Sequence, residues 1–76
     1  MGWKQRITFD PAACHGQACI RGTRVLVSVI LDNLAVGEPV ESICSGYHVA
    51  REDIEASLRY AAERAKDQAV LLGGGA

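Results

Sequence analysis

Apolar and polar residues alternate near the start of the chain and recur at helical spacing in the remainder. Residues 4–9 alternate and end at Asp10-Pro11, a pair that is typical of turns. Residues 19–27 predict one or two further short strands, with Gly22 at a bend or bulge. Because an isolated hairpin is marginal in water, these strands need further strands, which a second copy of the chain can supply.

Three helices are predicted after the strands, at residues 28–36, 39–45 and 51–70. Ser28 can cap the first helix, and Gly37 and Gly46 stand where the first two helices should end. One side of the third helix is apolar, through Ile54, Leu58, Ala61, Ala62, Ala65 and Ala69. Helix, glycine turn, short helix, turn and longer helix is the order of a helix-turn-helix unit, although small helical bundles share it.

These elements predict an α+β fold that is mostly α, with short N-terminal β-strands followed by three helices. Residues 1–72 are expected to form one domain, and residues 73–76, Gly-Gly-Gly-Ala, to form a disordered tail. A chain of 76 residues buries only about 60% of its unfolded surface, so a lone core is marginal. Self-association as a homodimer is therefore expected. The candidate contacts with a partner or second copy are Trp3, Ile7, Phe9, Val70 and Leu71.

Three cysteines are an odd number, and residues 1–6 lack the apolar core of a signal peptide, which favours the cytoplasm. No apolar run approaches the roughly 20 residues that cross a bilayer, so no membrane association is expected. Cysteine and histidine are zinc-binding types, but no CxxC pair is present. Buried thiols are the favoured interpretation; a metal site and a Cys14–Cys19 disulfide remain alternatives. We expect no metal and no cofactor.

Charge is unevenly distributed, because residues 1–31 are mainly basic and residues 32–76 are mainly acidic. Five arginines are candidate DNA contacts: Arg21, Arg24, Arg51, Arg59 and Arg64. For Arg24 the alternative is an internal ion pair with Asp10 or Asp32. The third helix carries five acids against four bases, which favours a solvated face over a surface for the major groove.

Other chemistry has little support in the sequence. Gly16 and Gly22 next to arginines can cradle a phosphate, but two tight turns with positive φ are the favoured interpretation. The two histidines, His15 and His48, have no nucleophile and orienting group arranged around them, so we expect no enzyme activity.

Residues 6–66 resemble the domain of unknown function 433 family. The resemblance rests on Arg6-Ile7, Asp10-Pro11, Cys14-x-Gly16-x-x-Cys19-Ile20-x-Gly22-Thr23-Arg24-Val25, Leu31-x-x-Leu34-Ala35-x-Gly37, Arg51-Glu52-Asp53-Ile54 and Tyr60-Ala61. It implies a homeodomain-like helix-turn-helix fold and, as in several members, a VapB-like antitoxin partnered with a PIN-like nuclease toxin.

Two residues depart from the family pattern. Ala18 replaces a proline, and Ala50 replaces the threonine or serine that precedes the third helix. An alanine there loses about 1 kcal/mol of capping, so the helix start is expected to be either frayed or held by Asp53 alone.

The expected function is that of an antitoxin-like protein that binds a PIN-like toxin. Operator DNA is a further candidate partner. The alternatives are a DNA-binding regulator without a toxin and a structural interaction module. The charge pattern of the third helix distinguishes the antitoxin from the DNA-binding regulator. Arginines in one stripe clear of the acids favour binding to DNA, whereas a face dominated by acids favours a protein partner.

Overall fold

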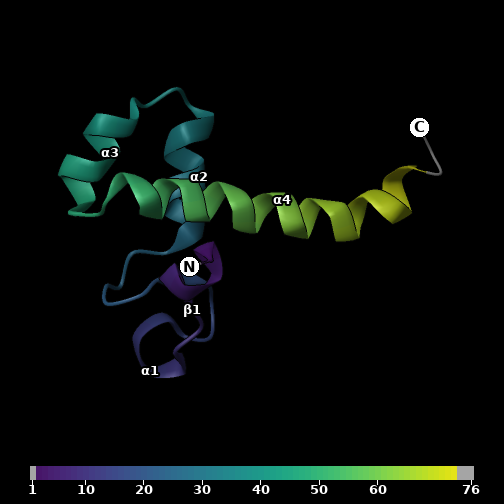
Figure 1. Cartoon of the computed structure of the whole chain (residues 1–76), viewed down its shortest axis with the longest axis horizontal. Helices are drawn as coiled ribbons and strands as arrows, with labels where there is room; N and C mark the ends of the chain where they lie inside the picture. Colours follow the sequence, from purple (N-terminus) through teal and green to yellow (C-terminus); the bar gives the residue numbers. More distant parts are fainter. Residues whose placement is uncertain (1, 74–76) are drawn as a thin grey trace.

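The fold, taken from a computed structural model, is described for the backbone of residues 2–73 and the side chains of residues 2–12 and 14–67. Figure 1 shows a small N-terminal β-element followed by helices, the last of which is much the longest. In order, the elements are the 3₁₀ helix η1 (Trp3–Arg6), β1 (Ile7–Thr8), α1 (Pro11–Cys14), β2 (Cys19–Ile20), α2 (Val27–Ala35), α3 (Val40–Tyr47) and α4 (Arg51–Gly73).

The β-element is an antiparallel pair in which Ile7 faces Ile20 and Thr8 faces Cys19. A single further bridge joins Cys19 to Leu26. The predicted α+β class with mostly helical content is therefore confirmed. The predicted strand over residues 4–9 is wrong in length, because residues 3–6 coil into η1 and pack against α4.

Asp10-Pro11, expected to be a turn, instead begins the short helix α1. The Asp10 carboxylate accepts a hydrogen bond from the Ala12 backbone N–H at 2.9 Å, and Pro11 takes the first helical position. His15 ends this turn in the left-handed region, with φ 54°. Gly16 and Gly22 also have positive φ, which confirms the two glycine turns predicted from the sequence.

The two middle helices differ from prediction at their ends. Ser28 does not cap α2, because the helix begins at Val27 after Leu26 and no side chain caps it. Gly46 does not end α3, which runs through it to Tyr47 and closes at His48 with φ 57°. An Ile43 side chain buried in the core holds this last turn in place, so tertiary packing overrides the glycine signal.

The start of α4 confirms the role predicted for Asp53. Its carboxylate accepts a hydrogen bond from the Ala50 backbone N–H at 2.9 Å, which is half of a capping box. Ala50 has no side-chain acceptor to supply the other half. The helix reaches Gly73, so that residue does not begin a tail, and residues 74–76 lie outside the described residues.

Completing this capping box is expected to stabilise the protein. In Ala50→Ser the new hydroxyl can accept a second hydrogen bond from the Asp53 backbone N–H, which already donates to the Ala50 carbonyl at 2.9 Å, and the free energy of unfolding should rise by about 0.5–1 kcal/mol. Urea denaturation followed by circular dichroism measures the change. Ala62→Ser, at an exposed position inside α4, is the control and should be slightly destabilising; an equal loss in both variants would contradict the prediction.

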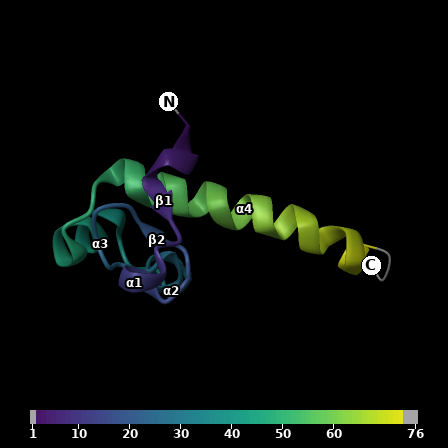
Figure 2. The ribbon, with the colours of Figure 1, turned by 90° about the horizontal axis from the view of Figure 1, so that it is seen from below.

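The core lies where the β-element, α2, α3 and the first half of α4 meet. Its buried members are Ile7, Ile20, Val27, Ile30, Ile43, Val49, Ile54 and Ala56. Beyond the core α4 continues alone, as Figures 1 and 2 show, and residues 62–67 are all exposed. Within the described residues, no helix has both the length and the apolar character to cross a membrane.

Candidate functional site

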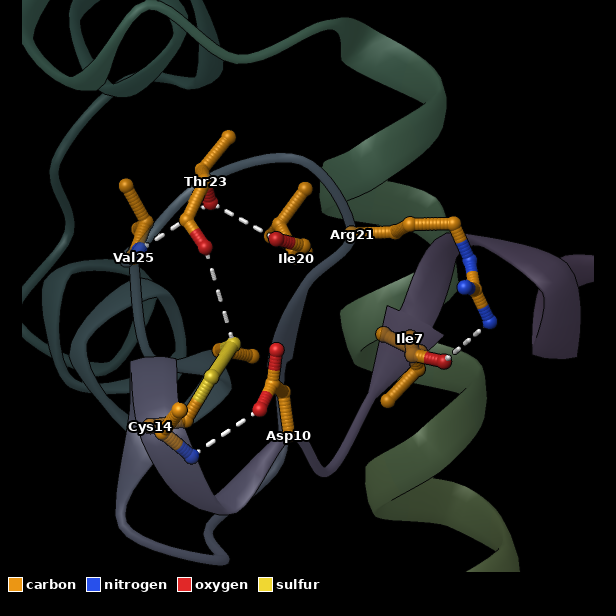
Figure 3. The surroundings of a disulfide bond; sticks show 9 residues. Ile7, Asp10, Cys14, Ile20, Arg21, Thr23 and Val25 are labelled. Carbon is orange, nitrogen blue, oxygen red and sulfur yellow. Dashed lines mark hydrogen bonds between the residues drawn. A yellow bond between two sulfur atoms is a disulfide. The ribbon is translucent and has the colours of Figure 1, made fainter.

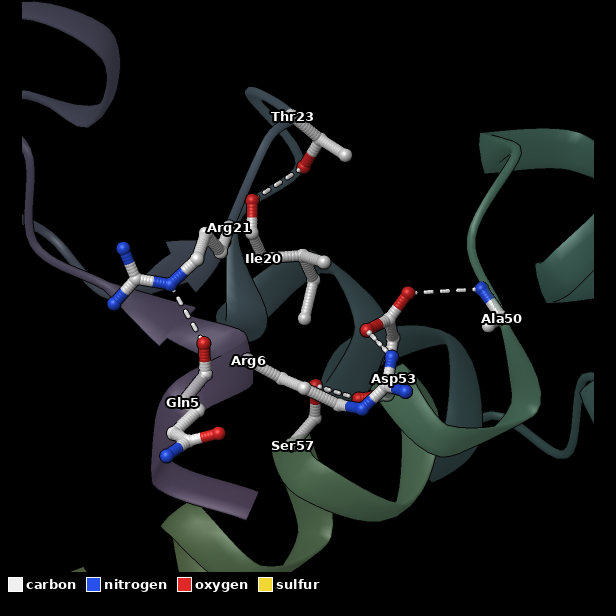
Figure 4. Close-up of polar contacts among 8 residues, drawn as sticks. All are labelled: Gln5, Arg6, Ile20, Arg21, Thr23, Ala50, Asp53 and Ser57. Atoms are coloured by element: carbon white, nitrogen blue, oxygen red, sulfur yellow. Dashed lines mark hydrogen bonds and ion pairs between the residues drawn. The ribbon is translucent and has the colours of Figure 1, made fainter. Parts of the chain in front are cut away.

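Asp53 also anchors the N-terminal segment to α4. The Arg6 guanidinium donates to its Oδ1 at 2.9 Å, while Oδ2 caps the helix (Figure 4). The Asp53 side chain is only 12% exposed, and the Ser57 hydroxyl donates to the Asp53 carbonyl one turn later. This cluster fixes η1 across α4, and sequence reasoning missed the contribution of Arg6.

Arg21 is exposed, and its side chain lies along the same N-terminal segment. Its Nε donates to the Gln5 carbonyl at 2.6 Å and its Nη2 to the Ile7 carbonyl at 3.5 Å (Figures 3 and 4). Two carbonyl partners give this candidate DNA contact a structural role in holding η1 and β1. Arg24 is exposed on the following turn, and within the described part of the chain it forms no ion pair with Asp10 or Asp32.

The turn that carries Arg24 is built by Thr23. Its hydroxyl donates to the Ile20 carbonyl at 2.7 Å and accepts from the Val25 N–H at 3.0 Å. Gly22, with φ 81°, supplies the backbone conformation that such a turn needs. The Gly-Thr-Arg sequence is thus accounted for by turn geometry.

Two of the three cysteines are joined by a disulfide bond. Cys14 and Cys19 form a disulfide, with Cα atoms 6.4 Å apart, and only Cys44 is free (Figure 3). The favoured prediction of thiols at these two positions is therefore wrong, although both residues are buried as expected. The left-handed turn at His15 and Gly16 reverses the chain and brings Cys14 back to β2. Over the residues described, no three His, Cys, Asp or Glu side chains form a metal-binding group.

The three arginines of α4 do not form one basic stripe. Arg51 contacts the Glu41 carboxylate at 3.4 Å, and Arg59 lies two turns further on, among Glu52, Glu55 and Glu63. Arg64 lies about 140° around the helix from Arg59. Acidic residues therefore interrupt the exposed face of α4, and the five candidate arginines are spread over two regions of the molecule.

The Arg51–Glu41 contact provides a pH test. The pKa of Glu41 is lowered by a hydrogen bond from its own backbone N–H and, less strongly, by the Arg51 side chain. A lowered folded-state pKa stabilises the protein above the ordinary glutamate pKa, and this contribution is lost as the pH falls through the folded value. In Arg51→Ala the Glu41 pKa should rise but stay below its usual value, as an NMR titration of the carboxyl carbon would show. A fully restored pKa would contradict the backbone contribution.

Three of the predicted partner contacts meet at a surface groove beside α4. Trp3, Ile7 and Phe9 line a hollow of about 300 Å³ together with Tyr60 of α4. Ile7 is also a core residue, whereas Phe9 is 52% exposed. The Phe9 and Tyr60 rings are tilted against each other, with centroids 6.0 Å apart. The other two predicted contacts, Val70 and Leu71, belong to α4, but their side chains lie outside the described residues.

A second hollow of about 390 Å³ lies beside the first and shares Phe9, Tyr60 and Arg64 with it. Its other walls come from the loop closed by the disulfide and from Leu31 of α2. We call the two hollows together the aromatic groove, defined by Trp3, Lys4, Phe9, Leu31, Tyr60, Glu63 and Arg64. Sequence reasoning placed Arg64 on a DNA-binding surface, but its four-residue spacing from Tyr60 already puts both on one side of α4.

Residues 7–61 match the family described as Protein of unknown function (DUF433), over 55 of the 76 residues of the chain. The chain belongs to this family. No curated protein and no solved structure matches the chain. The DUF433 region includes Phe9, Leu31 and Tyr60 of the aromatic groove, whereas Trp3 and Lys4 precede it and Arg64 follows it.

Proposed function

We propose that this DUF433 protein is antitoxin-like and works by binding a protein partner, a PIN-like nuclease toxin. The observation that carries the proposal is the charge pattern of α4. Binding to DNA needs several cations that face the phosphates together. On α4, Arg51 and Lys66 contact Glu41 and Glu63, and further acids separate the remaining arginines.

The aromatic groove supports the same proposal. Exposed aromatic rings beside exposed arginine are typical of the centre of protein–protein interfaces. Residues of the N-terminal segment and of α4 line the groove together, because η1 packs on α4. A partner would therefore bind a surface that is already formed. Binding to operator DNA remains part of the proposal, as a second activity of the complex.

The experiment is an affinity capture with the tagged full chain from a lysate of the organism that encodes it, with and without nuclease treatment. The proposal expects a protein that is retained in both samples, degrades RNA when purified alone, and loses that activity when an equimolar amount of this chain is added. Retention of DNA and its associated proteins only in the untreated sample would instead establish a DNA-binding regulator. A captured protein whose activity is unaffected by the chain would also contradict the proposal.

A further inference from the structure

The aromatic groove leaves aromatic side chains exposed to solvent. Phe9 is half exposed, and the Tyr60 and Trp3 rings beside it are only partly buried. An aromatic side chain in water forgoes most of the hydrophobic free energy that its burial would supply. Hollows on both sides of the Phe9–Tyr60 pair offer space for two separate apolar side chains.

The charges around the groove are not neutralised within the described chain. Lys4 and Arg64 line it, and neither lies within 4.0 Å of a carboxylate among the described side chains. Lys4 instead lies over the Trp3 ring, with its Nζ 5.8 Å from the centroid. The one acid that lines the groove, Glu63, contacts Lys66 at 3.8 Å. The groove is therefore apolar at its centre and positively charged at its edge.

The backbone beside the groove limits how an occupant can bind. β1 and β2 are two residues long, so a partner strand would find few free main-chain groups to pair with. An amphipathic helix needs no such pairing, because it presents apolar side chains at a spacing of three or four residues. Two neighbouring hollows suit two such side chains.

We infer that the aromatic groove binds an amphipathic, acidic helix of the partner protein. Two apolar side chains of that helix enter the hollows on either side of Phe9 and Tyr60, and its carboxylates face Lys4 and Arg64. This inference rests on the proposed function, since it names the part of the partner that the chain recognises. In this arrangement the acidic face of α4 makes no contact with the partner helix.

The test begins with a phage-displayed library of helical peptides selected against the full chain. The inference expects selected peptides with apolar residues at helical spacing and with aspartate or glutamate beside them. A synthetic copy of the best peptide is then titrated against the chain, with the fluorescence of Trp3, the single tryptophan, as the signal. Basic peptides, or no enriched peptides, would overturn the inference.

Matched variants locate the binding site. Phe9→Ala and Arg64→Glu should each weaken peptide binding by about tenfold or more. Leu58→Ala and Arg59→Glu are the controls, because Leu58 is 50% exposed and Arg59 is exposed but neither lines the groove. Circular dichroism confirms that all four variants fold. The inference would be overturned if Phe9→Ala weakened peptide binding no more than Leu58→Ala, or if Arg64→Glu weakened it no more than Arg59→Glu. It would also be overturned if the chain formed a homodimer that Phe9→Ala dissociates, because a second copy would then occupy the groove.

The same variants separate this inference from the proposed function. If the captured nuclease is retained by wild type and by Leu58→Ala but not by Phe9→Ala, both proposals stand. If all three retain it, the antitoxin function stands and the groove is not its site. If no nuclease is captured but the peptide titrations still depend on Phe9 and Arg64, the groove stands and the antitoxin function fails.

Discussion

Ile30→Ala is expected to remove a large part of the stability of this protein. Ile30 lies at the centre of α2 with 0% of its surface exposed, packed among the β-element, α3 and α4. Truncation removes three carbon atoms and leaves a cavity, which typically costs about 2–5 kcal/mol. A domain of this size has about 4–11 kcal/mol in total, so the loss amounts to between about a fifth of that stability and all of it.

Thermal and urea unfolding of the full chain measure this effect. The melting temperature should fall by more than about 10 °C, because 1 kcal/mol corresponds to roughly 4–8 °C in a domain of this length. Ile30→Val, which removes one carbon, should cost only about 0.5–1.5 kcal/mol. Val36→Ala, at a position that is 80% exposed, should change stability by less than about 0.5 kcal/mol. A similar small loss for all three variants would mean that Ile30 is not in a close-packed core.

The main helices were predictable from the sequence because their signals are local. Ile54 and the alanines that follow it recur at the period of a helix, and Asp53 stands three residues after the capping position. The positive φ of Gly16 and Gly22 was predictable for the same reason, since the turn needs a residue without a Cβ.

The parts that were not predictable depend on residues far apart in the chain. Residues 4–6 belong to the stretch 4–9 that alternates like a strand, yet they form part of η1 because α4 and the Arg21 side chain hold them in place. His48, and not Gly46, ends α3, because the buried Ile43 keeps the last turn of α3 helical. No local sequence pattern predicts such packing.

The aromatic groove was half predictable. The sequence predicts Trp3 and Phe9 as candidate partner contacts, because large apolar side chains near a terminus need cover, and both line the groove. Tyr60 and Arg64 join them from a helix some fifty residues later, so their contribution depends on how α4 crosses the N-terminal segment. Whether a charged side chain on a helix suits contact with DNA or with a protein partner depends on which residues lie next to it in the folded chain.

Asp53→Ala is expected to cost about 2–3 kcal/mol, more than any substitution at an exposed ion pair of this chain. The substitution removes the cap on the Ala50 N–H, worth about 1 kcal/mol. It also removes a carboxylate that is nearly buried and accepts a charged hydrogen bond from Arg6. Such bonds contribute about 1.5–3 kcal/mol when buried, and the 44% exposure of the Arg6 side chain reduces that figure.

A double-mutant cycle separates these two contributions. Arg6→Ala removes the ion pair alone, so the coupling energy between Arg6 and Asp53 in urea denaturation should be about 1 kcal/mol. The same cycle on Arg51 and Glu41, whose side chains are 71% and 77% exposed, should give less than about 0.5 kcal/mol. Equal coupling in the two cycles would mean that burial does not strengthen the Arg6–Asp53 pair. Because this pair holds η1 on α4, Asp53→Ala should also displace Trp3, which a shift in its fluorescence would report.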